Sequence, residues 1–187
     1  LALCALNIRA LPLLEGADEG EHAVQADYSA THRALPELNN GRPSHQSAQP
    51  PLYHIIVAAV FAPFDRSELR ELMRLNPNTQ TEPNRYLHKP GEFAVMSGAA
   101  QAIAAGRALS SLLGCVTLLC VWSVSRRLFR DAAGRGWSHV PAGPGALFAM
   151  SLVAFNPKFI HMHSVINNDV SVTLFSALAL AWLLRIL

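Results

Sequence analysis

The sequence predicts an all-α fold: a polytopic α-helical membrane protein with an outer-side loop layer that contains short amphipathic helices. Hydrophobic residues make up 51% of the 187 residues, against 15% charged residues, and they are gathered into long runs. Such runs are typical of segments that cross a bilayer. The net charge of +2 comes with no dense basic face, so we expect no nucleic-acid partner.

Residues 1–14 are expected to form the end of a first membrane helix. The chain begins at Leu1 rather than Met, and it stops at Leu187 inside an apolar run. We therefore expect an N-terminal fragment of a longer protein. Because the charged region that would mark a signal sequence is missing, a signal segment remains an alternative to a membrane helix.

Residues 15–97 are expected to form a long outer loop. Its polar stretches, 15–49 and 65–92, hold nearly all the acidic residues and contain turn signals such as NNG, NPN and EPN. Between them lies PPLYHIIVAAVFAPF, residues 50–64. This apolar run between prolines is short for a hydrocarbon core of ~30 Å, so it predicts an interfacial or re-entrant helix.

Three later runs predict membrane helices at residues 98–127, 142–157 and 168–187. The first contains 18 consecutive uncharged residues, a length usual for a spanning helix. The second lies in a stretch of 22 residues without a formal charge, and Pro157 is expected to close it. The third has only ~15 apolar residues, or ~22 Å of helix, so we expect it to be longer in the complete protein.

A basic loop between the first two of these helices sets the predicted orientation. It contains a single acid, Asp131, and four arginines, which the positive-inside rule places in the cytoplasm: Arg126, Arg127, Arg130 and Arg135. One crossing away, residues 15–92 and the turn 158–169 then share the outer side. Two acid-bearing segments far apart in sequence are therefore expected to meet at one membrane face.

The first candidate site is EGADEGEH, residues 15–22. If a helix begins at Glu19, Asp18 and His22 lie four residues apart on one face, which suits a carboxylate base beside an imidazole. The alternative is structural, with Asp18 as the helix N-cap and Glu21 as its partner in a variant of the capping box. Spacing alone favours the cap.

The second candidate site is FNPKFIHMHSVINNDVSV, residues 155–172, which places Asn168 and Asp169 at the start of the last helix. Asp169 also has a structural alternative, because an acid in the first turn of a helix interacts favourably with the helix dipole. His161 and His163 resemble a metal-binding pair only weakly, since no third ligand is near.

Arg107 is the third candidate, because it lies inside an apolar stretch. A charge within a membrane segment is costly and calls for a functional hypothesis. The alternative is that the side chain snorkels to the outer interface. Sequence alone does not separate the two.

These segments, in this order, resemble the N-terminal part of the GT-C class of membrane glycosyltransferases. The similarity lies in the DE pair with its following His, QPPLY at 49–53, RALSSLLGCVT at 107–117, SRRLF at 125–129, and FNPKF followed by NND within 155–169. The chain is most similar to the bacterial glycosyltransferase 39-like, dolichyl-phosphate-mannose/protein-mannosyltransferase-like group. The resemblance covers nearly all 187 residues.

The resemblance implies that a sugar moves from a polyprenyl-phosphate-linked donor to an acceptor hydroxyl on the non-cytoplasmic side, in a multi-pass protein of the bacterial plasma membrane. It makes Asp18 the catalytic base, with Glu19 beside it and Asp169 as a second acid. It places the PPLY segment near the lipid-linked donor. The residues expected to contact substrate are His22, Pro51, Tyr53, Arg107 and Asn168. One departure is Gln49, which stands where many members have Lys or His.

The expected partners are the lipid-linked sugar donor, membrane lipid and an acceptor that this sequence does not identify. The sequence identifies no certain cofactor, and a divalent metal is left open. The alternative function is a non-enzymatic polytopic membrane protein, either a transporter or an assembly factor. Acids facing an aqueous path through the helices, rather than a lateral lipid groove, would favour that alternative.

Overall fold

The structure is a computed structural model that describes residues 2–37, 44–88, 97–136 and 139–186. Within these residues the chain is helical, and the only β-type pairing is an isolated antiparallel bridge between Leu75 and Tyr86. The all-α prediction is therefore confirmed. In chain order the elements are α1 (Ala2–Ala10), α2 (Glu19–His32), the 3-10 helix η1 (His45–Ala48), α3 (Leu52–Phe61), α4 (Leu69–Leu72), α5 (Gly98–Gly134), α6 (Ala142–Ala154), α7 (Pro157–Met162) and α8 (Asp169–Ile186).

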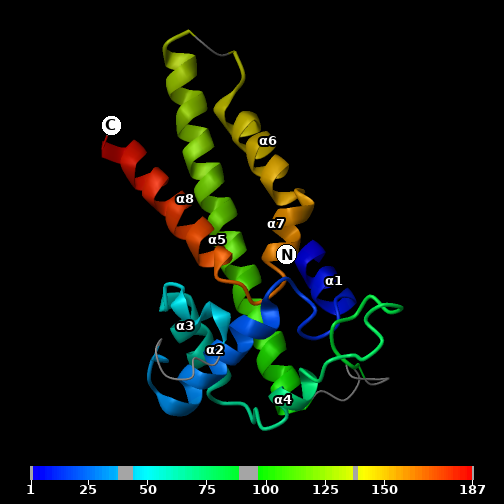
Figure 1. Ribbon diagram of the computed structural model, residues 1–187. Coiled ribbons are helices and arrows are strands. Elements are labelled where there is room, and N and C mark those ends of the chain that lie inside the picture. Colours follow the sequence, from blue (N-terminus) through cyan, green and yellow to red (C-terminus); the bar gives the residue numbers. More distant parts are fainter. Residues whose placement is uncertain (1, 38–43, 89–96, 137–138, 187) are drawn as a thin grey trace.

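Helix α5 is the central axis of the molecule (Figure 1). Helices α6 and α8 pack along its upper part, while α2, α3 and α4 gather around its lower end. Helix α1 lies against α7. The chain therefore forms a narrow bundle above a broader layer of short helices and loops.

Helix α5 is longer than predicted, since it continues to Gly134 rather than ending at residue 127. The arginines assigned to a cytoplasmic loop thus lie largely on its last turns. No proline or glycine interrupts these turns before Gly134, and side-chain pairs four residues apart support them. Arg126 stacks over the Trp122 ring at 5.1 Å, and Arg127 is 3.8 Å from Asp131.

The prediction for residues 142–157 was right at its start and wrong at its end. Helix α6 stops at Ala154, and its 13 residues are fewer than the ~20 needed to cross a bilayer. Pro157 opens α7 instead of closing α6, because proline fits the first turn of a helix and Asn156 caps it. The last helix agrees with the prediction within a residue at each described end.

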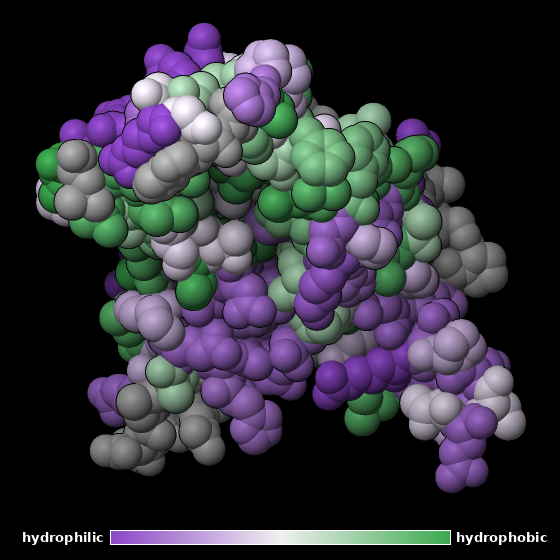
Figure 2. All heavy atoms as spheres, turned by 90° about the horizontal axis from the view of Figure 1, so that it is seen from above, coloured by the Kyte–Doolittle hydropathy of each residue, from purple (hydrophilic) through white to green (hydrophobic). Residues whose placement is uncertain are grey.

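Helices α5 and α8 are long and apolar enough to cross a membrane. Only 22% and 17% of their most apolar windows are buried, whereas the core helix of a soluble protein is mostly buried. Viewed from above, hydrophobic residues are concentrated in the upper half of the picture, interrupted by hydrophilic patches, and the lower half is mainly hydrophilic (Figure 2). The low burial of the two apolar helices suggests membrane association. The exposed large apolar residues on α5, α6 and α8 include Leu112, Leu119, Phe148, Leu152, Phe175 and Trp182.

The segment predicted to be a short interfacial helix forms α3, whose 10 residues are too few to span a bilayer. Helix α3 buries Tyr53, Val57 and Phe61 and exposes Leu52 and Ile55. It packs closely on α5, because a Cβ on Gly106 would lie 3.2 Å from the Phe61 ring. The lower end of the molecule therefore has its own apolar core, against which the candidate site is built.

Candidate functional site

Asp18 precedes α2, which begins at Glu19 as the site hypothesis required. Its backbone is left-handed, with φ of 57°, and its side chain makes no capping hydrogen bond. Asp18 therefore occupies the predicted N-cap position, but its side chain does not cap the helix, and the capping-box alternative with Glu21 is wrong. Aspartate tolerates this conformation better than most residues, and here it leaves the side chain exposed at the surface.

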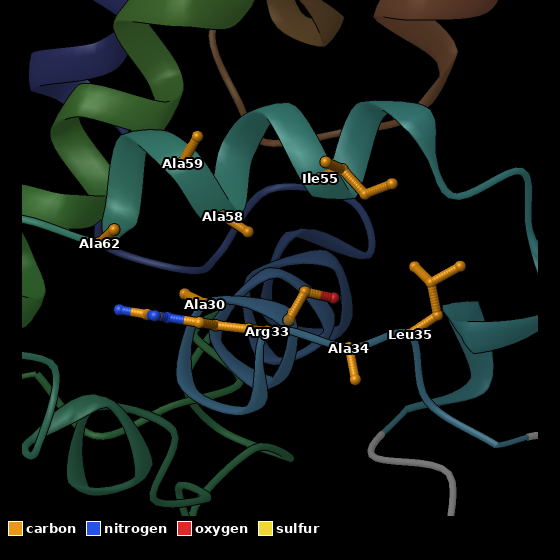
Figure 3. Close-up of a pocket in the computed structure, with 9 residues that line it drawn as sticks. Ala30, Arg33, Ala34, Leu35, Ile55, Ala58, Ala59 and Ala62 are labelled. Carbon is orange, nitrogen blue, oxygen red and sulfur yellow. The ribbon is translucent and has the colours of Figure 1, made fainter.

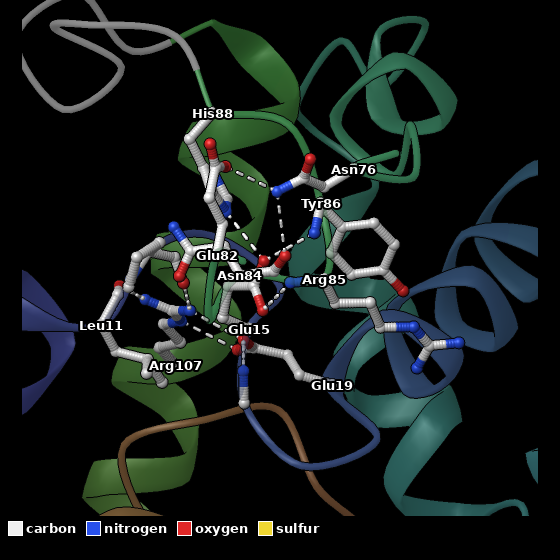
Figure 4. Close-up of polar contacts among 12 residues, drawn as sticks. Leu11, Glu15, Glu19, Asn76, Glu82, Asn84, Arg85, Tyr86, His88 and Arg107 are labelled. Carbon is white, nitrogen blue, oxygen red and sulfur yellow. Dashed lines mark hydrogen bonds and ion pairs between the residues drawn. The ribbon is translucent and has the colours of Figure 1, made fainter. Parts of the chain in front are cut away.

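Glu19, in contrast, is fully buried and forms an ion pair with Arg107. The Arg107 Nε donates to Oε1 at 2.8 Å and its Nη2 donates to Oε2 at 2.7 Å (Figure 4). Two backbone groups also donate to this carboxylate, Ile166 N at 3.1 Å and Gly16 N at 3.3 Å. Such a bidentate contact between a guanidinium and a carboxylate fixes the orientation of both side chains.

The remaining donors of Arg107 all point at backbone carbonyls. Nη1 donates to Ile8 O at 3.2 Å and to Leu11 O at 2.9 Å, and Nη2 donates to Pro12 O at 2.7 Å. A guanidinium has five N–H donors, and each is used here. Arg107 is 1% exposed, so the snorkelling alternative is wrong. In this arrangement every donor of Arg107 is occupied within the protein, and the side chain holds Glu19 and the chain around residues 8–12 in place.

The two acid-bearing segments meet, as predicted. The Glu19 carboxylate accepts from Ile166 N, and Asn167 Nδ2 donates to Ala17 O at 3.3 Å. Asp169 is the first residue of α8, its side chain is exposed, and its N–H donates to Asn167 Oδ1 at 2.8 Å. The structure thus holds exposed acids in two segments that are joined by a buried polar junction.

The PPLY segment divides into an exposed and a buried part. Pro51 is exposed at the start of α3, whereas the Tyr53 ring is fully buried. The Tyr53 hydroxyl lies 2.8 Å from Ser110 Oγ and accepts from Asn167 N at 3.0 Å. Burial raises the pKa of Tyr53 to about 12. Tyr53 therefore links α3 to α5 and to the turn before α8. Of Pro51 and Tyr53, only Pro51 is exposed at the surface.

Asn168 and Gln49 form a second link between these segments. Asn168 is 5% exposed, and its Nδ2 donates to Gln49 Oε1 at 3.2 Å. Its Oδ1 accepts from Ser171 Oγ at 2.9 Å. Gln49 itself is exposed. Among the described residues, no hydrogen bond is found for the Nε2 of this glutamine.

His22 pairs with His54, a residue that was not predicted to belong to the site. Both are buried, and His22 Nδ1 lies 2.9 Å from His54 Nε2. The ring centroids are 5.2 Å apart, and the ring planes are stacked with an inclination of 23°. The signal in the sequence is a histidine directly after PPLY.

Burial lowers the pKa of both histidines to about 4. For His22 the charge of Asp18 opposes this effect, and for His54 the neighbouring His22 adds to it. Both imidazoles are therefore neutral at pH 7, where one nitrogen of each ring carries a proton and the other accepts a hydrogen bond.

Glu15 was also not predicted to be important, although it organises the polar loop around it. Its carboxylate accepts from Arg85 N at 2.9 Å, from Tyr86 N at 2.8 Å and from His88 Nε2 at 2.9 Å (Figure 4). Burial acts to raise the pKa of Glu15, but these hydrogen bonds outweigh burial and lower it. Glu15 thus holds residues 85–88 beside the start of α2.

The two histidines of the second candidate segment do not form a pair. His163 is buried in the bundle, where its Nδ1 donates to Phe159 O at 2.8 Å and its ring stacks on Phe159. Across the ranges that the structure describes, no three His, Cys, Asp or Glu residues are placed to hold a metal ion together.

No protein-family model, no curated protein and no solved structure matches this chain. The function of the site therefore rests on the chemistry of its own residues.

Proposed function

We propose that the protein is a multi-pass membrane glycosyltransferase that transfers a sugar from a polyprenyl-phosphate donor to an acceptor hydroxyl on the non-cytoplasmic side. One observation carries the proposal. The exposed carboxylates of Asp18 and Asp169 flank a rigid, buried junction between segments about 150 residues apart. Catalytic groups need such support, because a small misplacement of a reacting group lowers the rate severely.

In the proposed reaction the acceptor hydroxyl oxygen attacks the anomeric carbon of the donor sugar. The bond from that carbon to the phosphate oxygen breaks, and the polyprenyl phosphate leaves with the electron pair, so the configuration is inverted. The hydroxyl proton passes to the Asp18 carboxylate, which acts as a general base. Asp18 suits this role because its side chain is exposed and does not cap α2. Asp169 supplies the second negative charge at the site.

His22 is proposed to orient a substrate hydroxyl. His22 Nδ1 lies 2.9 Å from His54 Nε2, while His54 Nδ1 has no hydrogen-bond partner among the described residues. The proposal uses the tautomers in which His22 Nδ1 donates to His54 Nε2, so that the second nitrogen of His22, Nε2, is an acceptor. The charge of Asp18 acts to raise the pKa of His22, against the effect of burial. His54 thereby sets the tautomer through which His22 contacts substrate.

The contact with the leaving phosphate is proposed to come from a neutral amide side chain rather than from the cation Arg107. Arg107 has no donor to spare, because the carboxylate of Glu19 and three carbonyls occupy it. Gln49 is exposed, two residues before the exposed Pro51, and Asn168 donates to its Oε1 and leaves its Nε2 without a partner among the described residues. We therefore assign the phosphate contact to Gln49, and the positioning of this residue to Asn168.

The test is sugar transfer by the full-length protein in membranes, with a labelled polyprenyl-phosphate sugar added on the non-cytoplasmic side. The proposal predicts release of free polyprenyl phosphate and incorporation of label into an acceptor, both absent from membranes that lack the protein. Protein-dependent passage of an intact solute across the membrane, without donor consumption, would instead favour the transporter.

A further inference from the structure

A cavity lies between the C-terminal half of α2 and helix α3 (Figure 3). Its volume is about 360 Å³, which falls within the ~300–1,000 Å³ that is typical of small-molecule sites. Most of its wall is aliphatic. The lining residues are Ser29, Ala30, Arg33, Ala34 and Leu35 from α2 and the segment after it, and Ile55, Ala58, Ala59 and Ala62 from α3 and its C-cap.

The two ends of this cavity differ in chemistry. Figure 3 shows the Arg33 side chain extending along the cavity toward Ala30 and Ala62, while Leu35 and Ile55 lie at the opposite end. Arg33 carries the only formal charge among the lining residues, and none of them is acidic. One end thus attracts an anion, and the other offers an aliphatic surface.

Ser29 adds an independent indication that the cavity holds a polar ligand group. This residue lines the cavity and is 8% exposed, and its hydroxyl has no hydrogen-bond partner. A buried hydroxyl without a partner is unfavourable, because it has lost its hydrogen bonds to water and gained none in the protein. A ligand oxygen beside Arg33 would satisfy it. The wall and its polar groups therefore match an amphiphile with an anionic head and an aliphatic chain.

We propose that this cavity binds one anionic glycerophospholipid of the outer leaflet. Its phosphate contacts Arg33 and Ser29, and one acyl chain passes between the alanines of α3 and leaves past Leu35 and Ile55. Leu52 and Ile55 are exposed on α3 and continue the aliphatic surface beyond the cavity. The inference rests on the membrane placement proposed above and does not depend on the transferase activity.

The lipid-linked sugar donor is a poorer occupant than a phospholipid. Asp18 lies before the first residue of α2, and Arg33 lies after the last. The 14 residues between them place the two ends ~21 Å apart, at ~1.5 Å per residue. A donor with its phosphate at Arg33 would hold its sugar far from the proposed base, so the two ligands use different places.

The test is lipid retention by the full-length protein, reconstituted in nanodiscs of dioleoyl-phosphatidylglycerol and dioleoyl-phosphatidylcholine and released for native mass spectrometry. We expect one phosphatidylglycerol to be retained in preference to phosphatidylcholine. Arg33→Gln should reduce this retention about threefold, as for an exposed ion pair. Ala59→Leu should reduce it about tenfold by filling the cavity. Matched controls are Arg74→Gln and Ala133→Leu, which change exposed residues outside the cavity and should retain the lipid.

Equal retention of the two lipids, or unchanged retention in Ala59→Leu, would overturn the proposal. Preferential retention of added undecaprenyl phosphate would overturn it too, since the site would then hold the donor. Sugar transfer is measured on the same samples. Normal sugar transfer without lipid retention would contradict the lipid site and leave the transferase proposal standing. Lipid retention without sugar transfer would support the lipid site and contradict the transferase proposal.

Discussion

Replacing Glu19 by glutamine tests the buried junction on which the site is built. The carboxylate accepts four hydrogen bonds, two from Arg107 and one each from Gly16 and Ile166. Glutamine keeps one accepting oxygen, but its amide NH₂ faces the groups that donate to the second carboxylate oxygen in the parent protein. Breaking one partner of a buried ion pair lowers the free energy of unfolding by about 3–5 kcal/mol. Because three carbonyls still hold Arg107, we expect about 3 kcal/mol.

For a chain of this size 1 kcal/mol changes the thermal midpoint by ~2–4 °C, so Glu19→Gln should lower it by roughly 6–12 °C. The midpoint is followed by tryptophan fluorescence of the protein in detergent micelles. Glu71→Gln is the control, because Glu71 lies 3.9 Å from Arg74 and both side chains are more than half exposed. If Glu19→Gln lowered the midpoint no more than the control does, the junction would not be the structural element described above.

Two further predictions concern pH and orientation. Burial holds the pKa of His22 and His54 at about 4, against 6.5 for a free histidine, so the unfolded chain takes up protons first as the pH falls. The stability due to the neutral pair is therefore fully present above about pH 6.5 and is lost as the pH falls toward about 4. When the thermal midpoint is measured from pH 7.5 to 4.5, it should fall less steeply in His54→Phe than in the unsubstituted protein. In a protein without its native cysteines, Thr79→Cys should react with an impermeant thiol reagent from outside intact cells and Ala133→Cys should not; the reverse result would contradict the proposed orientation.

Sequence patterns were sufficient where one local property decides the structure. The last helix was predicted within a residue, since its apolar run begins directly after the polar NND and nothing interrupts it. The short helix α3 followed from the prolines around residues 50–64. The end of α5 was missed because arginines were interpreted as a loop, although arginine favours helices when no glycine or proline follows.

The partners of buried polar groups were not predictable from spacing. Arg107 stood out as a charge in an apolar run, but its partner Glu19 lies 88 residues earlier, and the three carbonyls it contacts carry no sequence signal. Asp18 occupies the N-cap position that its spacing predicts, but only the structure shows that its backbone is left-handed and that its side chain makes no capping bond. The pairing of His22 with His54 likewise depends on how α2 packs against α3.

The most direct test of the central claim is the steady-state kinetics of Asp18→Asn in the full-length protein, with a polyprenyl-phosphate sugar as donor. Asparagine has nearly the same size and polarity, and Asp18 makes no capping bond that the change would remove. A general base needs a carboxylate, so the account predicts that kcat falls by about 100-fold or more while the KM for the donor is unchanged. An unchanged kcat at matched protein levels would contradict the role of Asp18 and, with it, the proposed mechanism.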